Sequence, residues 1–392
     1  MSLEKDHIYF PNLNGLRFFA AFMVLYDHVK FFKYVFGVNQ YKFPVQTNLG
    51  DLGVTLFFVL SGFLITYLLI HEHNKYGKIQ LRFFYMRRVL RIFPLYFLTV
   101  FLAFFVLPCF LNIPHFSSNN PLFPNDNNLH LIPSEDGFFY KKLFLFMIFL
   151  PNLSYIVYDL IPFGSQLWSV GVEEQFYLFW PTLLMFFHKK MLPVLLLIAV
   201  GIAFSPFIIE WAGGDLSIHP KMLILKNFLY FFRIDSMAIG GIMAYFLAKK
   251  KEIFLNFIYN IWSQFVILII VIGGLLFNGT LTYFHHQVYS VLFGIVILNL
   301  ASNPKPIISL EHPVFKYLGK ISYGLYIYNP LAIVISINIC LSVFQTESIL
   351  FNTVLMILSI GLSIILSSAS YHLFEEKFLK LKPRFSKILS NS

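Results

Sequence analysis

The first apolar segment of the chain, NGLRFFAAFMVLYDHV at residues 14–29, contains an arginine, an aspartate and a histidine. On an α-helix, Arg17 and His28 lie within about 20° of the same face and roughly 16 Å apart along the axis. Asp27 points about 100° away from His28, so we do not expect it to orient the histidine. His28 can act as a general base, although a buried polar contact is the more usual role of a lone histidine in a helix.

Carboxylates and another arginine occur in the fourth and sixth apolar segments along the chain. Residues 165–181 contain Glu173, and the later segment contains Arg233 and Asp235. Arg233 and Asp235 are two residues apart and point away from each other on a helix, so each should find its partner on another helix. If both segments run inward across a membrane, these groups reach the depth of His28. The pattern therefore predicts an acid–base site formed by His28, Glu173 and Asp235.

Three arginines lie close together in FFYMRRVLRIFP, residues 83–94. Helical spacing places Arg87, Arg88 and Arg91 on one broad face before the third apolar segment. Guanidinium groups bind phosphate through paired hydrogen bonds, which makes this face a candidate phosphate site. The alternative is that the arginines only hold a loop on the inner side of a membrane, and the motif taken alone favours that simpler interpretation.

Most of the remaining sequence consists of segments suited to crossing a bilayer. The chain is 58% hydrophobic and 12% charged, a composition that excludes a soluble fold. Crossing about 30 Å of hydrocarbon takes about 20 helical residues, and segments of this kind begin near residues 13, 50, 90, 167, 191, 227, 258, 283, 321 and 349. We predict an all-α, polytopic membrane helix bundle with about ten transmembrane helices. Residues 1–392 are expected to form one integral-membrane domain without an extra extracytoplasmic soluble domain.

Lysine and arginine are distributed unevenly between alternate loops. With ten spans and a cytoplasmic N-terminus, 21 of the 29 basic residues lie in inner loops and seven in outer loops. This bias follows the positive-inside rule, so both termini are predicted to be cytoplasmic, in a cell inner membrane. A further apolar stretch at residues 142–158 would reverse every later loop if it crossed the membrane. We therefore predict that it is a re-entrant or interfacial segment, after a long polar loop at residues 117–136.

The net charge of +10 is explained by this topology and gives no reason to expect nucleic acid as a partner. No histidine spacing indicates a metal site. Two histidine pairs, at residues 71 and 73 and at residues 285 and 286, are interpreted as loop residues.

Several of these segments resemble motifs of the membrane acyltransferase-3 family, whose members are integral-membrane O-acyltransferases. The resemblance covers nearly the whole chain through NGLRFFAAFMVLYDH, LFFVLSGFLIT, RRVLRIFPLY, WSVGVEEQFYLFWP, FFRIDSMAIGGIMA and LGKISYGLYIYNPL. Many family members carry a histidine near Asn329, so a second-histidine role does not transfer to this chain. Asp27 is another departure, because that position is usually apolar in the family.

The resemblance implies transfer of an acyl group, most often acetyl, from cytoplasmic acyl-CoA to a carbohydrate hydroxyl, without a metal. The acceptor would be a cell-surface polysaccharide, a lipopolysaccharide or a glycolipid. The same resemblance implies that His28 is the general base or, as the less favoured alternative, a transient acyl carrier. The residues expected to bind the donor are Arg17, Arg87, Arg88 and Arg91.

Two other classes of function remain as alternatives. A transporter or flippase for a glycan or an acyl group would also carry charges within its spans. The sequence contains no internal repeat or matched pair of broken helices, which disfavours this class. A non-enzymatic membrane assembly factor would leave the intramembrane polar residues unexplained. Release of CoA on addition of acetyl-CoA would distinguish an enzyme from a transporter or flippase.

Overall fold

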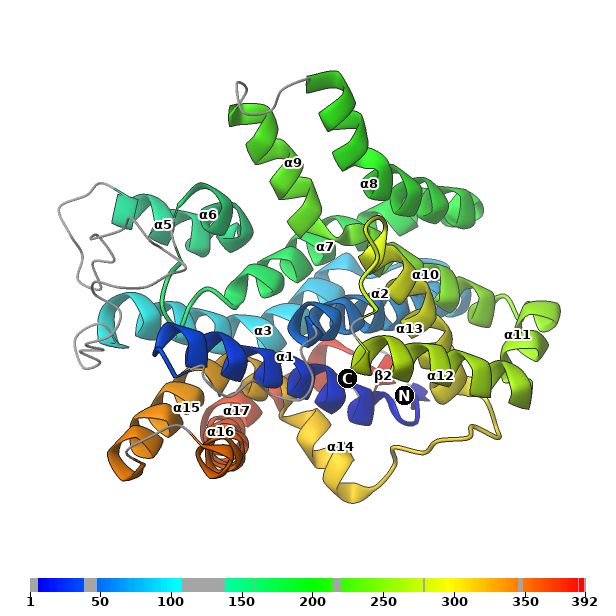
Figure 1. Cartoon of the computed structure of the whole chain (residues 1–392). Coiled ribbons are helices and arrows are strands. Elements are labelled where there is room, and N and C mark those ends of the chain that lie inside the picture. Colours follow the sequence, from blue (N-terminus) through cyan, green and yellow to red (C-terminus); the bar gives the residue numbers. More distant parts are fainter. Residues whose placement is uncertain are drawn as a thin grey trace.

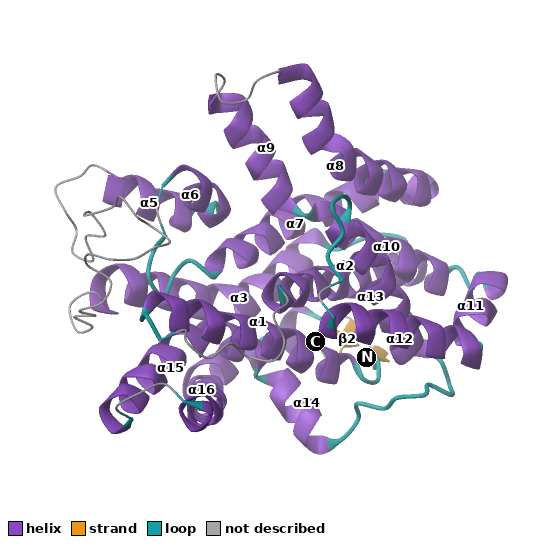
Figure 2. Cartoon of the chain, in the orientation of Figure 1, coloured by secondary structure: helices purple, strands orange, loops and turns teal. Residues whose placement is uncertain are grey.

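The chain folds into a bundle of helices, seen in a computed structural model that describes residues 6–38, 48–107, 138–158, 160–213, 220–277, 279–344, 348–386 and 388–390. Figure 2 shows helices joined by loops, with two short strands near the chain ends. The all-α class predicted from the sequence is confirmed.

The first half of the bundle contains α1 (Leu13–Val35), α2 (Leu49–Tyr76), α3 (Leu81–Phe101), α5 (Phe138–Met147), α6 (Pro151–Val157), α7 (Leu167–Phe186) and α8 (Met191–Gly213). The second half contains α9 (Pro220–Phe232), α10 (Ile234–Ala248), α11 (Glu252–Tyr259), α12 (Ile261–Leu276), α13 (His285–Ser302), α14 (Pro313–Lys320), α15 (Ser322–Val343), α16 (Ile349–Ser370) and α17 (Glu376–Leu379). A π-helical turn, Leu102–Val106, extends α3, and another, Tyr371–Glu375, joins α16 to α17. A 3-10 turn, Lys382–Phe385, follows α17.

Six helical stretches are long and apolar enough to cross a membrane, or seven if the bent pair α11 and α12 counts as one span. The predicted number of about ten is therefore not confirmed, although every predicted segment falls on a helix. The difference arises because α1, α7 and α13 carry polar residues along their length. In α1 these include Arg17, Asp27, Lys30 and Lys33, each of which is costly in hydrocarbon unless it has a partner.

Helix α2 lies at the centre of the bundle, packed against α10, α1 and α13 (Figure 1). Glycines allow the closest of these crossings. A Cβ atom on Gly62 of α2 would lie 1.9 Å from the carbonyl oxygen of Met237, and one on Gly240 of α10 would lie 2.2 Å from that of Val59. Any side chain at either glycine would force the two helices apart. Helix α2 also contacts α1 and α7, and α1 contacts α15, so these helices lie together around the site described below.

The segment at residues 142–158 is not one continuous helix. It contains the end of α5 and all of α6, and the chain turns between them at Phe149, which has a φ of 60°. The prediction that this segment is re-entrant or interfacial concerns its position in the membrane and stays a prediction. The polar loop predicted at 117–136 lies outside the described residues.

The two histidine pairs are not loop residues, which corrects the interpretation from the sequence. His71 and His73 belong to the last turns of α2, and His285 and His286 begin α13. Short polar segments next to apolar ones resemble loops in sequence, but here helical hydrogen bonding continues through them.

The two ends of the described chain lie side by side. Strand β1 (Asp6–Ile8) pairs in parallel with β2 (Ile388–Ser390), and Figure 1 shows both termini in the same region. A shared position of the two ends is compatible with the prediction that both lie on one side of the membrane. Which side they occupy stays a prediction.

Cysteine labelling in intact cells tests the predicted orientation. In a background without the natural cysteines, Thr282→Cys, between α12 and α13, should react with a membrane-impermeant maleimide. Arg384→Cys, in the turn after α17, should react only after permeabilisation, because the ten-span arrangement and the distribution of basic residues place it inside. Labelling of Arg384→Cys in intact cells would contradict a cytoplasmic C-terminus.

Candidate active site

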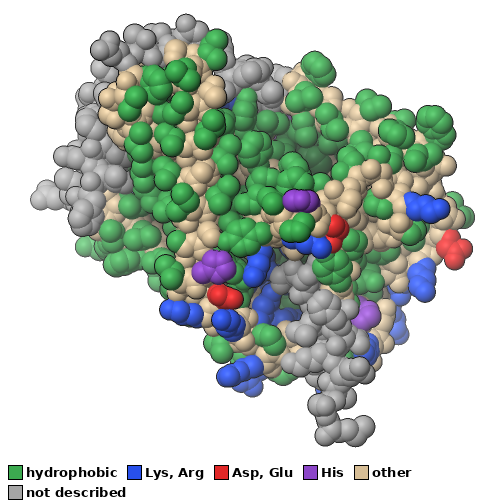
Figure 3. All heavy atoms as spheres, turned by 90° about the horizontal axis from the view of Figure 1, so that it is seen from below, with side chains coloured by type: hydrophobic (Ala, Val, Ile, Leu, Met, Phe, Trp, Pro, Cys, Tyr) green, Lys and Arg blue, Asp and Glu red, His purple; other side chains and the backbone are tan. Residues whose placement is uncertain are grey.

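One face of the bundle contains a hollow surrounded by cations, which we call the basic hollow. Its cavity volume is about 460 Å³. Figure 3 shows Lys and Arg side chains gathered around a hollow in this face, with hydrophobic side chains covering the part of the molecule above it in the view. Two carboxylates, Glu72 and Glu375, also line the cavity. The cations are Arg17, Arg87, Arg88, Arg91, Lys316, Lys320 and Lys382.

The three neighbouring arginines of the sequence project into this hollow from the first half of α3. The guanidinium of Arg87 already has partners within the protein. It pairs with Glu72 at 3.7 Å and donates to the backbone carbonyl of Phe385 at 2.9 Å. Arg88 is only 8% exposed and lies over the rings of Phe84 and Tyr177. Its buried Nε atom has no hydrogen-bond partner among the described residues. A buried guanidinium with an unused donor is suited to an anionic ligand.

A second cavity, of about 100 Å³, continues from the basic hollow, and we call it the inner hollow. Arg17, Arg88, Arg91 and Tyr323 line both cavities. Arg17 is 8% exposed and donates to Asn14 at 2.8 Å, so it is fixed at the junction. The remaining walls are mostly apolar and aromatic, from α2, α3, α7 and α15.

Glu173 lies in the inner hollow, on α7. Ser61 of α2 donates to one of its carboxylate oxygens at 2.9 Å, and Tyr177 donates to the other at 2.9 Å. Tyr177 also lies 3.2 Å from the Ser61 hydroxyl. These contacts fix the carboxylate beside the arginines of α3. Helical spacing brings Glu173 and Tyr177 together, because they are four residues apart.

His28 lines a third cavity, of about 230 Å³, which we call the outer hollow. Its Nδ1 lies 2.6 Å from the Oδ1 of Asn329 on α15. The amide nitrogen of Asn329 donates to the carbonyls of Leu325 and Tyr326 at 3.0 and 2.8 Å, which assigns its oxygen as the acceptor toward His28. The Nδ1 of His28 therefore carries the proton, and the Nε2 keeps the lone pair that a base needs.

Asp27 does not orient His28, as the helical geometry predicted. It pairs instead with Lys30 at 3.1 Å. The orienting partner is Asn329, a position noted in the sequence only because many family members have a histidine there. No local spacing could have revealed this contact, since the two residues are 301 positions apart.

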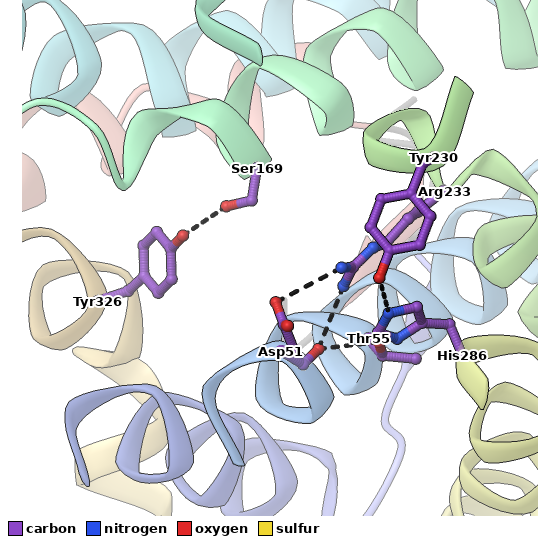
Figure 4. Close-up of polar contacts among 7 residues, drawn as sticks. All are labelled: Asp51, Thr55, Ser169, Tyr230, Arg233, His286 and Tyr326. Atoms are coloured by element: carbon purple, nitrogen blue, oxygen red, sulfur yellow. Dashed lines mark hydrogen bonds and ion pairs between the residues drawn. The ribbon is translucent and has the colours of Figure 1, made fainter. Parts of the chain in front are cut away.

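Arg233 and Asp235 find partners on other helices, which confirms that part of the prediction. Arg233 has a left-handed φ of 38° at the junction of α9 and α10, lies over the ring of Trp168 and pairs with Asp51 of α2 at 3.4 Å. Figure 4 shows this pair beside a second set of contacts, in which His286 lies 3.2 Å from both Thr55 and Tyr230. Arg233 thus ties α2 to the wall of the outer hollow, since Trp168 lines that cavity.

Asp235 lies apart from the other candidates. Its carboxylate accepts from Gln287 of α13 at 2.5 Å, it is 1% exposed, and it lines none of the three cavities described above. A carboxylate in the first turn of α10 also interacts favourably with the helix dipole. The expected convergence of the histidine with two carboxylates is therefore not found. Glu173 lies with the arginines, His28 lies with Asn329, and Asp235 lies with Gln287.

The three cavities provide two chemical environments, one after the other in space. The basic and inner hollows can hold a ligand with several negative charges, and the outer hollow presents an oriented imidazole beside aromatic and amide side chains. Among the residues that the structure describes, no three His, Cys, Asp or Glu side chains are grouped so that they could hold a metal ion.

The chain is similar to several bacterial proteins. O-acetyltransferase OatA of Staphylococcus aureus (strain NCTC 8325 / PS 47) is 26% identical over 83% of this chain and 51% of its own length. A candidate O-acetyltransferase of S. aureus (strain COL) is 24% identical over 96% of this chain and 58% of its own length. A candidate peptidoglycan O-acetyltransferase of Bacillus subtilis (strain 168), YrhL, is 30% identical over 54% of this chain and 30% of its own length.

This chain spans little more than half the length of the first two relatives and less than a third of the other. No solved structure matches it. The sequence profile of the acyltransferase-3 family, described as an acyltransferase domain, matches residues 10–368, which include α1, α2, α3, α7 and α15. The chain therefore belongs to the acyltransferase-3 family.

Proposed function

We propose that this protein is a membrane-embedded O-acyltransferase that moves an acyl group, most often acetyl, from acyl-CoA to a carbohydrate hydroxyl. The observation that carries the proposal is the order of the cavities. A basic hollow suited to phosphates continues into a narrow inner hollow, and His28 lies in the cavity beyond it. Family membership supports the acyl chemistry, and the names of the relatives support acetyl as the group transferred.

The donor would enter from the cytoplasm, with its phosphates bound by the cations of the basic hollow. Arg88 and Arg91 would contact phosphate directly, because they face both cavities. Arg87 would shape this site as well as adding charge, since it already pairs with Glu72. Arg17 would guide the acyl arm at the junction, and the thioester would then lie in the inner hollow.

Glu173 would position groups along this route. Its two oxygens are occupied by the hydroxyls of Ser61 and Tyr177, so it fixes the wall against which the acyl arm lies. Asp235 would take no part in the reaction, because it binds Gln287 and lies outside the three cavities, which gives it a structural role.

The reaction would take place where the acceptor hydroxyl meets His28. The unprotonated Nε2 would remove the hydroxyl proton as the oxygen attacks the thioester carbonyl carbon. The carbon–sulfur bond then breaks, the thiolate leaves as CoA, and the imidazolium returns the proton to the sulfur. Asn329 would hold the ring in the productive tautomer through its 2.6 Å contact with Nδ1.

The acceptor would occupy the outer hollow. Trp168 and Tyr155 line this cavity together with Gln166 and Asp27. Aromatic faces and a few polar side chains are typical of a site for an amphipathic ligand such as a sugar. We propose a cell-surface polysaccharide, a lipopolysaccharide or a glycolipid as the acceptor, in the bacterial inner membrane.

Incubation of the purified protein with acetyl-CoA and carbohydrate extracted from its native membrane tests this function. We expect free CoA and an O-acetylated carbohydrate in equal amounts, measured by a thiol assay and by mass spectrometry. A transporter or flippase would move its substrate and leave the thioester intact. Tight binding of acetyl-CoA without release of CoA, in the presence of the complete extract, would contradict the proposal.

A further inference from the structure

A wall separates the inner hollow from the outer hollow. Ser169 and Tyr326 line the inner hollow, whereas Gln166, Trp168 and Pro330 line the outer one. These residues come from the start of α7 and from one stretch of α15, so the two cavities face opposite sides of the same pair of helices. They share none of their lining residues.

Hydrogen bonds hold this wall closed. The hydroxyls of Tyr326 and Ser169 lie 2.6 Å apart, as Figure 4 shows, and Tyr326 also donates to the carbonyl of Gln166 at 2.8 Å. Gln166 donates in turn to the carbonyl of Ile327 on α15 at 3.0 Å. All three side chains are buried, with exposed fractions of 5% for Tyr326 and 6% for Ser169 and Gln166. Each hydrogen bond therefore closes α7 against α15 in a region with little water.

Tyr326 is linked to both the wall and the proposed base, His28. The carbonyl of Tyr326 accepts from Asn329, the residue that orients His28. A change of position at Tyr326 can therefore affect both the passage between the hollows and the histidine beyond it. Neither role was expected from the sequence, in which YGLYIY contains three tyrosines that look alike.

We propose that Tyr326 is the gate between the donor and acceptor cavities, with Ser169 as its latch. This inference rests on the proposed function, because it assumes an acyl thioester in the inner hollow. The closed wall separates that thioester from His28, and transfer requires the tyrosine hydroxyl to leave Ser169. Tyr326 is thus a positioning residue that controls when the acyl carbon can be attacked.

A loosened gate has a specific chemical consequence. Water in the outer hollow can then reach the thioester while His28 acts as base. The water oxygen attacks the carbonyl carbon, its proton passes to His28, the carbon–sulfur bond breaks, and the proton is returned to the sulfur. The products are acetate and CoA, formed without a carbohydrate acceptor. A latched gate prevents this loss while no acceptor is present.

Tyr326→Phe and Ser169→Ala each remove one side of the latch and keep most of the packing. In detergent with acetyl-CoA and no acceptor, each variant should release CoA between about twofold and tenfold faster than the wild type, the factor that corresponds to losing an ordinary hydrogen bond. The double variant should release CoA no faster than Tyr326→Phe alone, because that change already breaks the contact with Ser169 as well as the one with the Gln166 carbonyl. Tyr326→Phe combined with His28→Ala should return to background, because the leak needs the base.

Tyr328→Phe is the matched control. It removes a tyrosine hydroxyl from the same helix, where it donates to Ser370 at 3.1 Å and lines none of the three cavities described above. Its CoA release should equal that of the wild type. A similar increase in Tyr328→Phe would mean that any weakening of α15 causes leakage, and this would overturn the gate.

Binding of acetyl-CoA separates failure of this inference from failure of the proposed function. A wild type that neither binds acetyl-CoA nor uses it with an acceptor would contradict the function itself. A wild type that does both, with folded Tyr326→Phe and Ser169→Ala variants that release CoA no faster, would overturn only the gate. If Tyr326→Phe does not fold, Ser169→Ala carries the same test. Leakage that persists after loss of His28 would also overturn the gate, since the water would then reach the thioester by another route.

Discussion

Replacement of His28 by alanine should lower acyl transfer by about 10²- to 10⁴-fold, the range expected from loss of a general base. Binding of acyl-CoA should stay close to that of the wild type, because His28 lines the outer hollow and the cations that would hold the donor lie elsewhere. Turnover is to be measured per folded molecule in detergent or liposomes, with binding measured by calorimetry. His28→Gln should be similarly inactive, since an amide cannot accept the proton.

A control histidine separates catalysis from structure in this experiment. His188 follows the C-terminal end of α7 and lines none of the three cavities. His188→Ala should therefore keep normal turnover. A structural role for His28 would give a poorly inserted protein whose surviving molecules work normally. Turnover above about a tenth of the wild-type value in both His28 variants, far more than base removal allows, would show that His28 is not the base.

Loss of Arg88 or Arg91 should raise the KM for acyl-CoA by about tenfold to a hundredfold, as expected when a charge-assisted hydrogen bond is removed. The effect on kcat should be smaller, because these residues face the donor cavities and not the outer hollow. Arg88→Lys and Arg91→Lys should restore only part of the affinity, since an ammonium group cannot reproduce the planar guanidinium fork. Steady-state kinetics over a range of acetyl-CoA concentrations measure each effect.

Arg82 is the matched control for these arginines. It lies on the same helix, α3, but is exposed and lines none of the described cavities. Arg82→Ala removes the same charge from the same helix, so it reports any general loss of attraction for an anionic donor. A KM equal to the wild-type value in both Arg88→Ala and Arg91→Ala, at normal protein levels, would contradict the proposed donor site.

Much of the fold could be predicted from the sequence because it depends on local properties. Apolar segments of sufficient length become helices wherever they occur, and helical spacing alone brings Arg87, Arg88 and Arg91 to one face. The same geometry separated Asp27 from His28 and Arg233 from Asp235. Both expectations hold in the structure, although Arg233 lies at the junction of α9 and α10, just before the helix that carries Asp235.

The grouping of the site could not be predicted, because it depends on how distant helices pack. Depth in the membrane was inferred by counting residues from the ends of each segment, which placed Glu173 and His28 at the same level. The packing of α7 against α2 instead turns Glu173 toward Ser61, and the packing of α1 against α15 gives His28 its partner Asn329. A one-dimensional pattern contains no information about such contacts between helices far apart in sequence.

The central claim is that an acyl group passes from acyl-CoA in the basic hollow to a hydroxyl beside His28. It is tested most directly in liposomes of known protein orientation, with labelled acetyl-CoA supplied only on the face that carries Arg87 and Lys316, and polysaccharide fragments on the other. We predict free CoA on the donor side, label attached to carbohydrate, and loss of both products in His28→Ala. Label that stays on CoA, or crosses as intact acetyl-CoA equally well with wild type and His28→Ala, would contradict the claim.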